Sequence, residues 1–114
     1  MISFACMKIE LKNLIKCSFE LNKTDYDIFI FLIPKETGMA ANEIAKQMDL
    51  DRTTVQKSIK RLAEKDLVSR IQKNLARGGY IFTYSIKGKK IIKERMSEIV
   101  KKWHDSVQKE IIRW

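Results

Sequence analysis

The feature that most constrains the fold is a regular apolar stripe over the last quarter of the chain. Large apolar side chains recur there every three or four residues, which is the spacing of one helix face: Ile92, Met96, Val100, Trp103, Val107, Ile111 and Trp114. We expect one helix over residues 88–114, roughly 40 Å long at 1.5 Å per residue. A chain of 114 residues cannot cover so long a stripe within one small domain. Two copies of the helix could cover each other, so the pattern predicts a homodimer. The alternative is that the stripe packs on the first helix of its own chain.

The N-terminal segment has a related pattern. Apolar residues between Phe4 and Phe19 follow helical spacing but occupy more than one face. A helix that is apolar on two sides must be covered on two sides. We therefore expect residues 1–20 to form a second dimerisation helix, with Met7, Leu11 and Leu14 at the interface.

Both cysteines fall on this expected helix. Cys6 and Cys17 would share a face but lie about 16 Å apart, too far for a disulfide within one chain. Buried, inert thiols are the expectation, because free cysteines usually behave as small apolar residues. Redox sensing between two chains is the alternative.

The middle of the chain has the pattern of three short helices. Asn22 is a good N-cap with Asp25 three positions on, and Pro34 ends the helix that follows. We expect the next helix over Ala41–Met48 and another over residues 51–65 after a connection of only two residues. Such a pair of helices with a short turn is a helix-turn-helix.

The period then changes to that of strands. Leu67–Ile71 and Tyr80–Ile86 are rich in β-branched and aromatic residues, and a turn with Gly78 and Gly79 lies between them. They predict a β-hairpin with a basic tip over residues 72–79. The order of elements predicts a mainly α, α+β winged-helix fold. Residues 1–114 would form a single domain, with residues 22–86 as the winged helix and residues 1–20 and 88–114 as dimerisation helices.

Residues Asn42–Ser85 resemble the DNA-binding domains of MarR-like and TrmB-like transcriptional regulators. The resemblance rests on motif positions that follow one another in Asn42–Val68. These are the aliphatic-Ala pair Ile44-Ala45, a turn at Asp49-Leu50, the cap Asp51, a run of polar residues, the core residue Leu62 and the pair Leu67-Val68 that follows the helix. Four positions depart from the usual pattern, and one of them is Ala40, which replaces the common Thr or Ser cap before the first of the two helices. Asp49 and Asp66 stand where Gly is common, and Asp tolerates the left-handed conformation better than most residues. Ser58 occupies a position that is usually aliphatic.

The resemblance implies a regulator that binds double-stranded DNA through the helix over residues 51–65. We expect it to be cytoplasmic, because Met1–Phe4 lacks the basic region and long apolar stretch of a signal peptide. Val55, Ile59 and Leu62 would face inward and leave the polar residues outside. Arg and Gln there can read guanine and adenine edges in the major groove. We expect contacts to DNA from the helix and from the wing, which would follow the backbone or enter the minor groove: Arg52, Thr53, Thr54, Gln56, Lys57, Lys60, Arg61, Arg70, Lys73 and Arg77. Of these, Lys60 and Arg61 are better placed for phosphate than for bases.

The charge distribution agrees with a polyanionic partner. The chain carries 23 Lys and Arg against 14 Asp and Glu, and twelve of the basic residues against five of the acidic ones lie in residues 42–90. Concentrated basic charge is typical of nucleic-acid binding. The alternatives are a winged-helix module that binds protein in a transcription assembly and a non-specific, chromatin-like DNA binder.

The sequence excludes several other classes. It has no Gly-rich phosphate loop, no catalytic constellation and too few His and Cys for a zinc site, so we expect neither an enzyme nor a metal or cofactor. The longest apolar run, Ile28–Ile33, is too short to span a membrane. A small-molecule effector is implied only by the resemblance, and its identity is not encoded in a motif. The abundance of Lys and Ile suggests an AT-rich prokaryotic genome.

Overall fold

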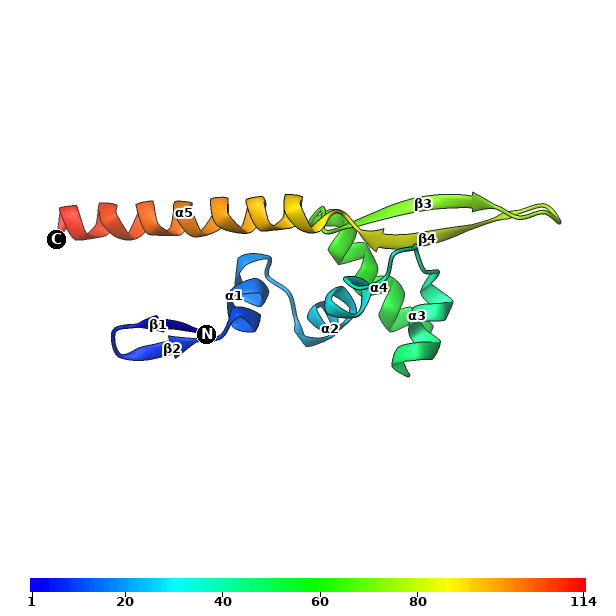
Figure 1. The fold of residues 1–114 in the computed structure, drawn as a ribbon, viewed down its shortest axis with the longest axis horizontal. Helices are drawn as coiled ribbons and strands as arrows, with labels where there is room; N and C mark the ends of the chain where they lie inside the picture. Colours follow the sequence, from blue (N-terminus) through cyan, green and yellow to red (C-terminus); the bar gives the residue numbers. More distant parts are fainter. The chain divides into compact units, whose positions relative to one another are not determined.

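The computed structural model describes residues 1–114 and contains five helices and two two-stranded antiparallel sheets (Figure 1). The chain divides into two compact units. One is Asn22–Lys87, and the other combines Met1–Leu21 with Gly88–Trp114. The α+β winged-helix fold expected from the order of elements is confirmed.

The central unit begins with α2 (Lys23–Leu32), which starts at a complete capping box. The Asn22 side chain accepts a hydrogen bond from the Asp25 backbone NH at 2.8 Å, and the Asp25 carboxylate accepts one from the Asn22 NH at 3.4 Å. These two bonds satisfy backbone donors that a helix N-terminus otherwise leaves unpaired. The inner face of α2 then supplies core residues of the central unit.

The helix-turn-helix consists of α3 (Ala41–Met48) and α4 (Arg52–Glu64), close to the expected bounds. Asp49 takes the left-handed conformation with φ of 55°, and Asp66 does so after α4 with φ of 63°. Both are positions where Gly is usual, so Asp fulfils the same backbone role. The Asp51 side chain makes no cap hydrogen bond, although the residue stands at the N-cap position.

One apolar core holds the central unit together. It is formed where α2 and α3 pack on α4 and where α4 leads into β3 (Val68–Asn74). Its buried apolar side chains come from all four elements and from the residue before β3: Ile28, Phe29, Leu32, Ile44, Ala45, Val55, Ile59, Leu62, Leu67 and Val68.

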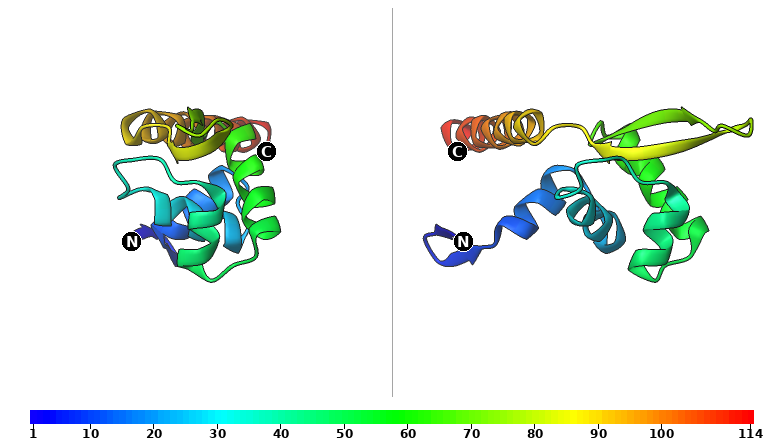
Figure 2. Two further views of the ribbon diagram at one scale, coloured as in Figure 1. Left: turned by 90° about the vertical axis from the view of Figure 1, so that its right-hand side faces the viewer. Right: turned by 45° about the vertical axis from the view of Figure 1, so that its right-hand side comes forward.

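The wing is the antiparallel pair of β3 and β4 (Tyr80–Ile86), in which Val68 pairs with Ile86 and Asn74 with Tyr80. It extends as a long ribbon beyond α3 and α4 in Figure 1 and in the right-hand view of Figure 2. A backbone bridge between Met39 and Tyr84 ties β4 to the segment before α3. The wing is therefore anchored at its base, and the hairpin expected from the sequence is confirmed.

The prediction of a helix from Phe4 onward is wrong. Residues 2–9 form a small hairpin of β1 (Ile2–Phe4) and β2 (Met7–Ile9), and α1 covers only Leu11–Ser18. Apolar and polar residues alternate in Ile2-Ser3-Phe4 and in Met7-Lys8-Ile9, which is the period of strands. The register pairs Ile2 with Ile9 and Phe4 with Met7, so one face of this hairpin is entirely apolar.

The expectation of buried thiols on one helix is also wrong. Cys6 lies in the turn of the small hairpin, Cys17 lies in α1, and both are exposed. The strand period of residues 2–9 places Cys6 outside the helix, so the separation worked out for a common helix does not apply.

The long C-terminal helix is confirmed as α5 (Lys89–Arg113). In the unit that it shares with the N-terminal segment, α5 contacts α1, and Arg95 lies over the Phe19 ring. Phe19 and Ile92 are buried, whereas every residue from 101 to 114 is exposed. None of the helices has the length and apolar character needed to cross a membrane.

Candidate nucleic-acid interface

The two faces of α4 differ sharply in chemistry. Val55, Ile59 and Leu62 are buried, as expected. The outward face carries exposed polar and cationic side chains, namely Arg52, Thr53, Gln56, Lys57 and Lys60, while Thr54 is half-buried. Residues 52–63 contain no acidic residue, so this face has a uniformly positive charge.

The start of α4 and the base of the wing form a hollow of about 210 Å³. Arg52 and Gln56 line one side of it, and the aromatic residues of β4 line another. Ala40, Ala41 and Asn42 at the start of α3 complete the wall. The fold therefore brings Arg52 and Gln56, two of the expected base-reading residues, beside strand β4 of the wing, which lies about thirty residues further along the sequence.

The wing carries the remaining expected DNA contacts. Arg70, Lys73 and Arg77 are all exposed, and residues 68–87 contain no acidic residue. The Arg70 guanidinium lies 4.3 Å from the centre of the Phe82 ring, a cation–π contact that orients it. Tyr80 packs edge-to-face on Phe82, with 5.4 Å between the ring centres. Phe82 therefore contacts both Tyr80 and Arg70 on the wing.

Arg61 differs from the other expected contacts, because it is bound to a buried carboxylate. Its Nη2 donates to Asp25 Oδ1 at 2.8 Å, and its Nε donates to Oδ2 at 3.1 Å. The Ser58 hydroxyl donates to the same Oδ1 at 2.5 Å. Asp25 is 1% exposed, whereas the Arg61 side chain is 40% exposed. Arg61 therefore links the core to the surface of α4.

Asp25 is ionised in this setting. Burial by itself raises the pKa of the carboxyl, but hydrogen bonds from Arg61, Ser58 and the Asn22 backbone outweigh it and hold the pKa below its ordinary value. The hydrogen bond to Asp25 in turn raises the pKa of Arg61. The pair is thus a charged one that joins α2 to α4.

Sequence reasoning did not assemble this cluster, although one signal was present. Ser58 lies three residues after Val55 and four before Leu62, which places a polar side chain on the buried face of α4. A buried hydroxyl requires a partner. The partner, Asp25, lies 33 residues away, and its local sequence indicates only a role in the cap of α2.

A helix-turn-helix followed by a two-stranded wing, with a cationic outer face on its second helix, defines a winged-helix protein. The pattern of the family described as "Sugar-specific transcriptional regulator TrmB" matches residues 15–89, about two thirds of the chain. The chain belongs to this family, and it is a transcriptional regulator rather than an enzyme. The resemblance noted in the sequence to MarR-like and TrmB-like regulators is confirmed.

Individual relatives agree. The uncharacterized protein MJ1503 of Methanocaldococcus jannaschii is 33% identical over 110 residues, which cover 90% of this chain and 83% of that protein. A possible transcriptional regulator from Methanosarcina mazei Go1 superposes with a TM-score of 0.91 at 34% identity, covering 100% of this chain and 96% of that one. The MepR–DNA complex of S. aureus has the same fold, with a TM-score of 0.58 at 19% identity, covering 89% of this chain and 82% of that chain.

Proposed function

We propose that this regulator binds double-stranded DNA in a sequence-specific manner, with α4 in the major groove and the wing on the backbone or in the minor groove. The observation that carries the proposal is the outward face of α4. Arg52, Gln56 and Lys57 are exposed on it, while the apolar face is fully used in the core. Helices in this position of a helix-turn-helix present their N-terminal residues to base edges.

Electrostatics supports the same function. The wing adds Arg70, Lys73 and Arg77 to the cations of α4, and neither residues 52–63 nor residues 68–87 contain an acidic residue. Phosphate contacts of this kind release counterions, so binding should weaken steeply as the salt concentration rises. Arg61 can still contribute here through Nη1, the guanidinium nitrogen that does not bond to Asp25.

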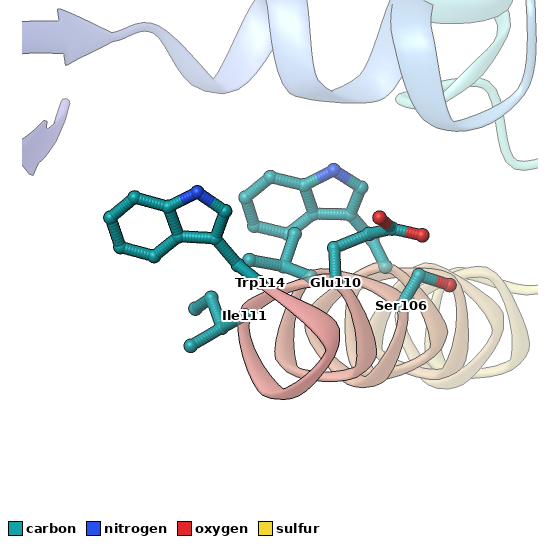
Figure 3. A pocket seen from close by; sticks show the side chains of 6 residues that line it. Ser106, Glu110, Ile111 and Trp114 are labelled. Atoms are coloured by element: carbon teal, nitrogen blue, oxygen red, sulfur yellow. The ribbon is translucent and has the colours of Figure 1, made fainter.

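The proposed active form is a homodimer. Trp103 is 61% exposed and Ile111 57% exposed, and together with Val107 and Trp114 they line an open apolar hollow on α5 (Figure 3). Exposed apolar patches of this kind mark interaction sites, and two indole side chains alone can bury about 150–250 Å² each.

The other expected interface residues lie on the same unit. Met7 and Leu11 are exposed, and Leu14 and Met96 are half-buried. A stable interface buries about 800 Å² on each partner. We therefore propose that a second copy covers both the apolar stripe of α5 and the apolar face of the small hairpin.

A two-fold dimer carries two copies of α4, so the operator should be pseudo-palindromic with half-sites about one helical turn apart. A small dimer can repress simply by occupying a promoter, and we therefore propose repression. The MepR–DNA complex, which has the same fold, is an example of a winged-helix protein bound to DNA.

The decisive experiment is fluorescence anisotropy with a labelled duplex from the gene's own upstream region and a scrambled duplex, each at two salt concentrations. The Arg52→Ala/Gln56→Ala variant should lose roughly 1–3 kcal/mol of discrimination for each good base contact that is removed. Its binding to scrambled DNA should change little, since base contacts carry the sequence information.

The matched control is Gln108→Ala/Lys109→Ala, which removes an amide and a cation from the exposed surface of α5. It should leave discrimination unchanged. Equal binding of wild type to both duplexes would favour a non-specific, chromatin-like protein. No binding at low salt would favour a module that binds another protein.

A further inference from the structure

The buried cluster of Asp25, Ser58 and Arg61 connects the first turn of α2 to the second half of α4. The other buried side chains of α2 and α4 are apolar, and burial of apolar surface is by itself non-directional. Hydrogen bonds are directional and fix both distance and angle. The apolar stripe of α4 selects the face that turns inward, and the cluster adds a directional constraint that fixes the position of that face more finely.

The carboxylate is itself held in place. Asp25 belongs to the capping box with Asn22, so its position follows from the start of α2. Ser58 and Arg61 lie three residues apart on α4, on adjacent turns of one face, and both donate to this carboxylate. Two attachment points on α4 and one fixed acceptor restrict rotation of α4 about its axis as well as sliding along it.

Register matters for the outward face of the same helix. Even a small rotation or slide of α4 that leaves Val55, Ile59 and Leu62 in the core would displace the outward side chains of the helix. Arg52 and Gln56 could then no longer meet the base edges that they fit, because a hydrogen bond tolerates only a few tenths of an ångström. Contacts to phosphates are more tolerant and carry no sequence information.

We propose that Asp25 is a positioning residue for DNA recognition, which sets the register of α4 through Ser58 and Arg61 and thereby the discrimination between operator and other DNA. The proposal rests on the proposed function. It assigns Asp25 no contact with DNA.

The main test replaces the whole cluster with apolar side chains, in the variant Asp25→Leu/Ser58→Ala/Arg61→Leu. Replacement of a complete buried ion pair by apolar residues is often neutral or stabilising, so this variant separates register from stability. We expect a melting temperature close to that of wild type. We also expect the affinity ratio between upstream and scrambled duplex to fall at least about tenfold, the equivalent of one good base contact.

A second variant, Arg61→Lys, keeps the positive charge at position 61 but loses the planar fork that bonds to both carboxylate oxygens. The slope of affinity against salt should stay at the wild-type value because the charge is retained. The affinity ratio between the two duplexes should fall, by less than in the triple variant. A purely structural role would lower the melting temperature without changing the ratio at temperatures where the protein is fully folded.

A readout without DNA completes the test. In the triple variant, methyl NMR signals of Ile28 and Leu62, which lie in the α2–α4 core, should broaden or double because more than one register is populated. Single sharp signals together with a wild-type affinity ratio in both variants would overturn the proposal. If wild type itself does not discriminate between the duplexes, the proposed function fails, and the NMR result alone then decides whether the cluster sets the register.

Discussion

Replacing Arg61 by Ala should be far more damaging than its partly exposed position suggests. The change removes the cation from Asp25, a residue that is only 1% exposed and whose carboxylate cannot turn to water. Breaking a buried ion pair from one side typically costs 3–5 kcal/mol, because the remaining charge is left buried. The Arg61 side chain is 40% exposed, so water can enter part of the vacated space, and we expect about 3 kcal/mol, the low end of that range.

This loss is large for a chain of 114 residues, since domains of this kind have a total stability of about 5–15 kcal/mol. At about 4 °C per kcal/mol for a domain of this size, the melting temperature should fall by about 12 °C. The assay is urea and thermal unfolding at pH 7, followed by circular dichroism. Lys60→Ala is the control, because it removes an exposed cation from the adjacent position of α4 and should change stability by no more than about 0.5 kcal/mol.

The dependence on pH gives the prediction a second, independent part. The native pKa of Asp25 is lowered, so its contribution to stability is fully present above the pKa of the unfolded chain. That contribution is lost as the pH falls through the lower native value. Without Arg61, burial should raise the pKa, and the variant should take up the proton at higher pH than wild type. The difference in the free energy of unfolding between wild type and Arg61→Ala should therefore be largest at pH 7 and should become smaller as the pH falls toward about 4.

A gap below about 1 kcal/mol at pH 7, or one that does not change with pH, would refute this reasoning. The first outcome would mean that the pair behaves as an ordinary surface ion pair, for which about 0–1 kcal/mol is usual. The second would mean that the loss comes from packing of the Arg side chain and not from the Asp25 charge.

Three further predictions concern other parts of the chain. Gly38→Ala should lower the free energy of unfolding in urea by about 1–3 kcal/mol, because the added Cβ would lie 2.8 Å from Oγ1 and 3.0 Å from Cβ of the buried Thr83. A stability equal to that of wild type would show that β4 can shift to make room for the methyl group. Arg77→Ala should weaken binding to upstream and scrambled duplexes alike and lower the magnitude of the salt slope by about 0.9, and a selective loss on the upstream duplex would indicate a base contact instead. Ile111→Asp should yield monomers in sedimentation velocity, whereas Ile112→Asp, which is exposed on another side of α5, should not; a dimer that survives Ile111→Asp would exclude the α5 stripe as the interface.

The helix-turn-helix and the wing could be predicted because their signals are local. The apolar spacing of Val55, Ile59 and Leu62 defines the inner face of α4, and the capping box of Asn22 with Asp25 defines the start of α2. Asp49 stands where Gly is common, and it adopts the left-handed conformation that the sequence led us to expect there. In each case, the residues that determine the structure lie within one or two helical turns of one another.

The N-terminal hairpin was missed because two periods compete in residues 2–9. Cys6 and Ile9 fit a helix that continues into α1, whereas Ile2, Phe4 and Met7 fit strands that alternate across a turn. Ala5 in the turn has a positive φ of 42°. The sequence does not predict this conformation, because neither Gly nor Asn, the residues that usually adopt it, stands there. Short strands without a turn residue leave helix and hairpin equally consistent with the pattern.

The sequence by itself determined the order of elements from α2 to α5, the inner and outer faces of α4 and the long apolar stripe of α5, because these depend on residues that are neighbours along one element. Only the tertiary structure decided the role of Arg61, which sequence position alone had assigned to phosphate. Its bond to Asp25 joins residues 36 positions apart. The partner of a buried charge depends on which helices pack together and in which register, and that is a property of the folded core.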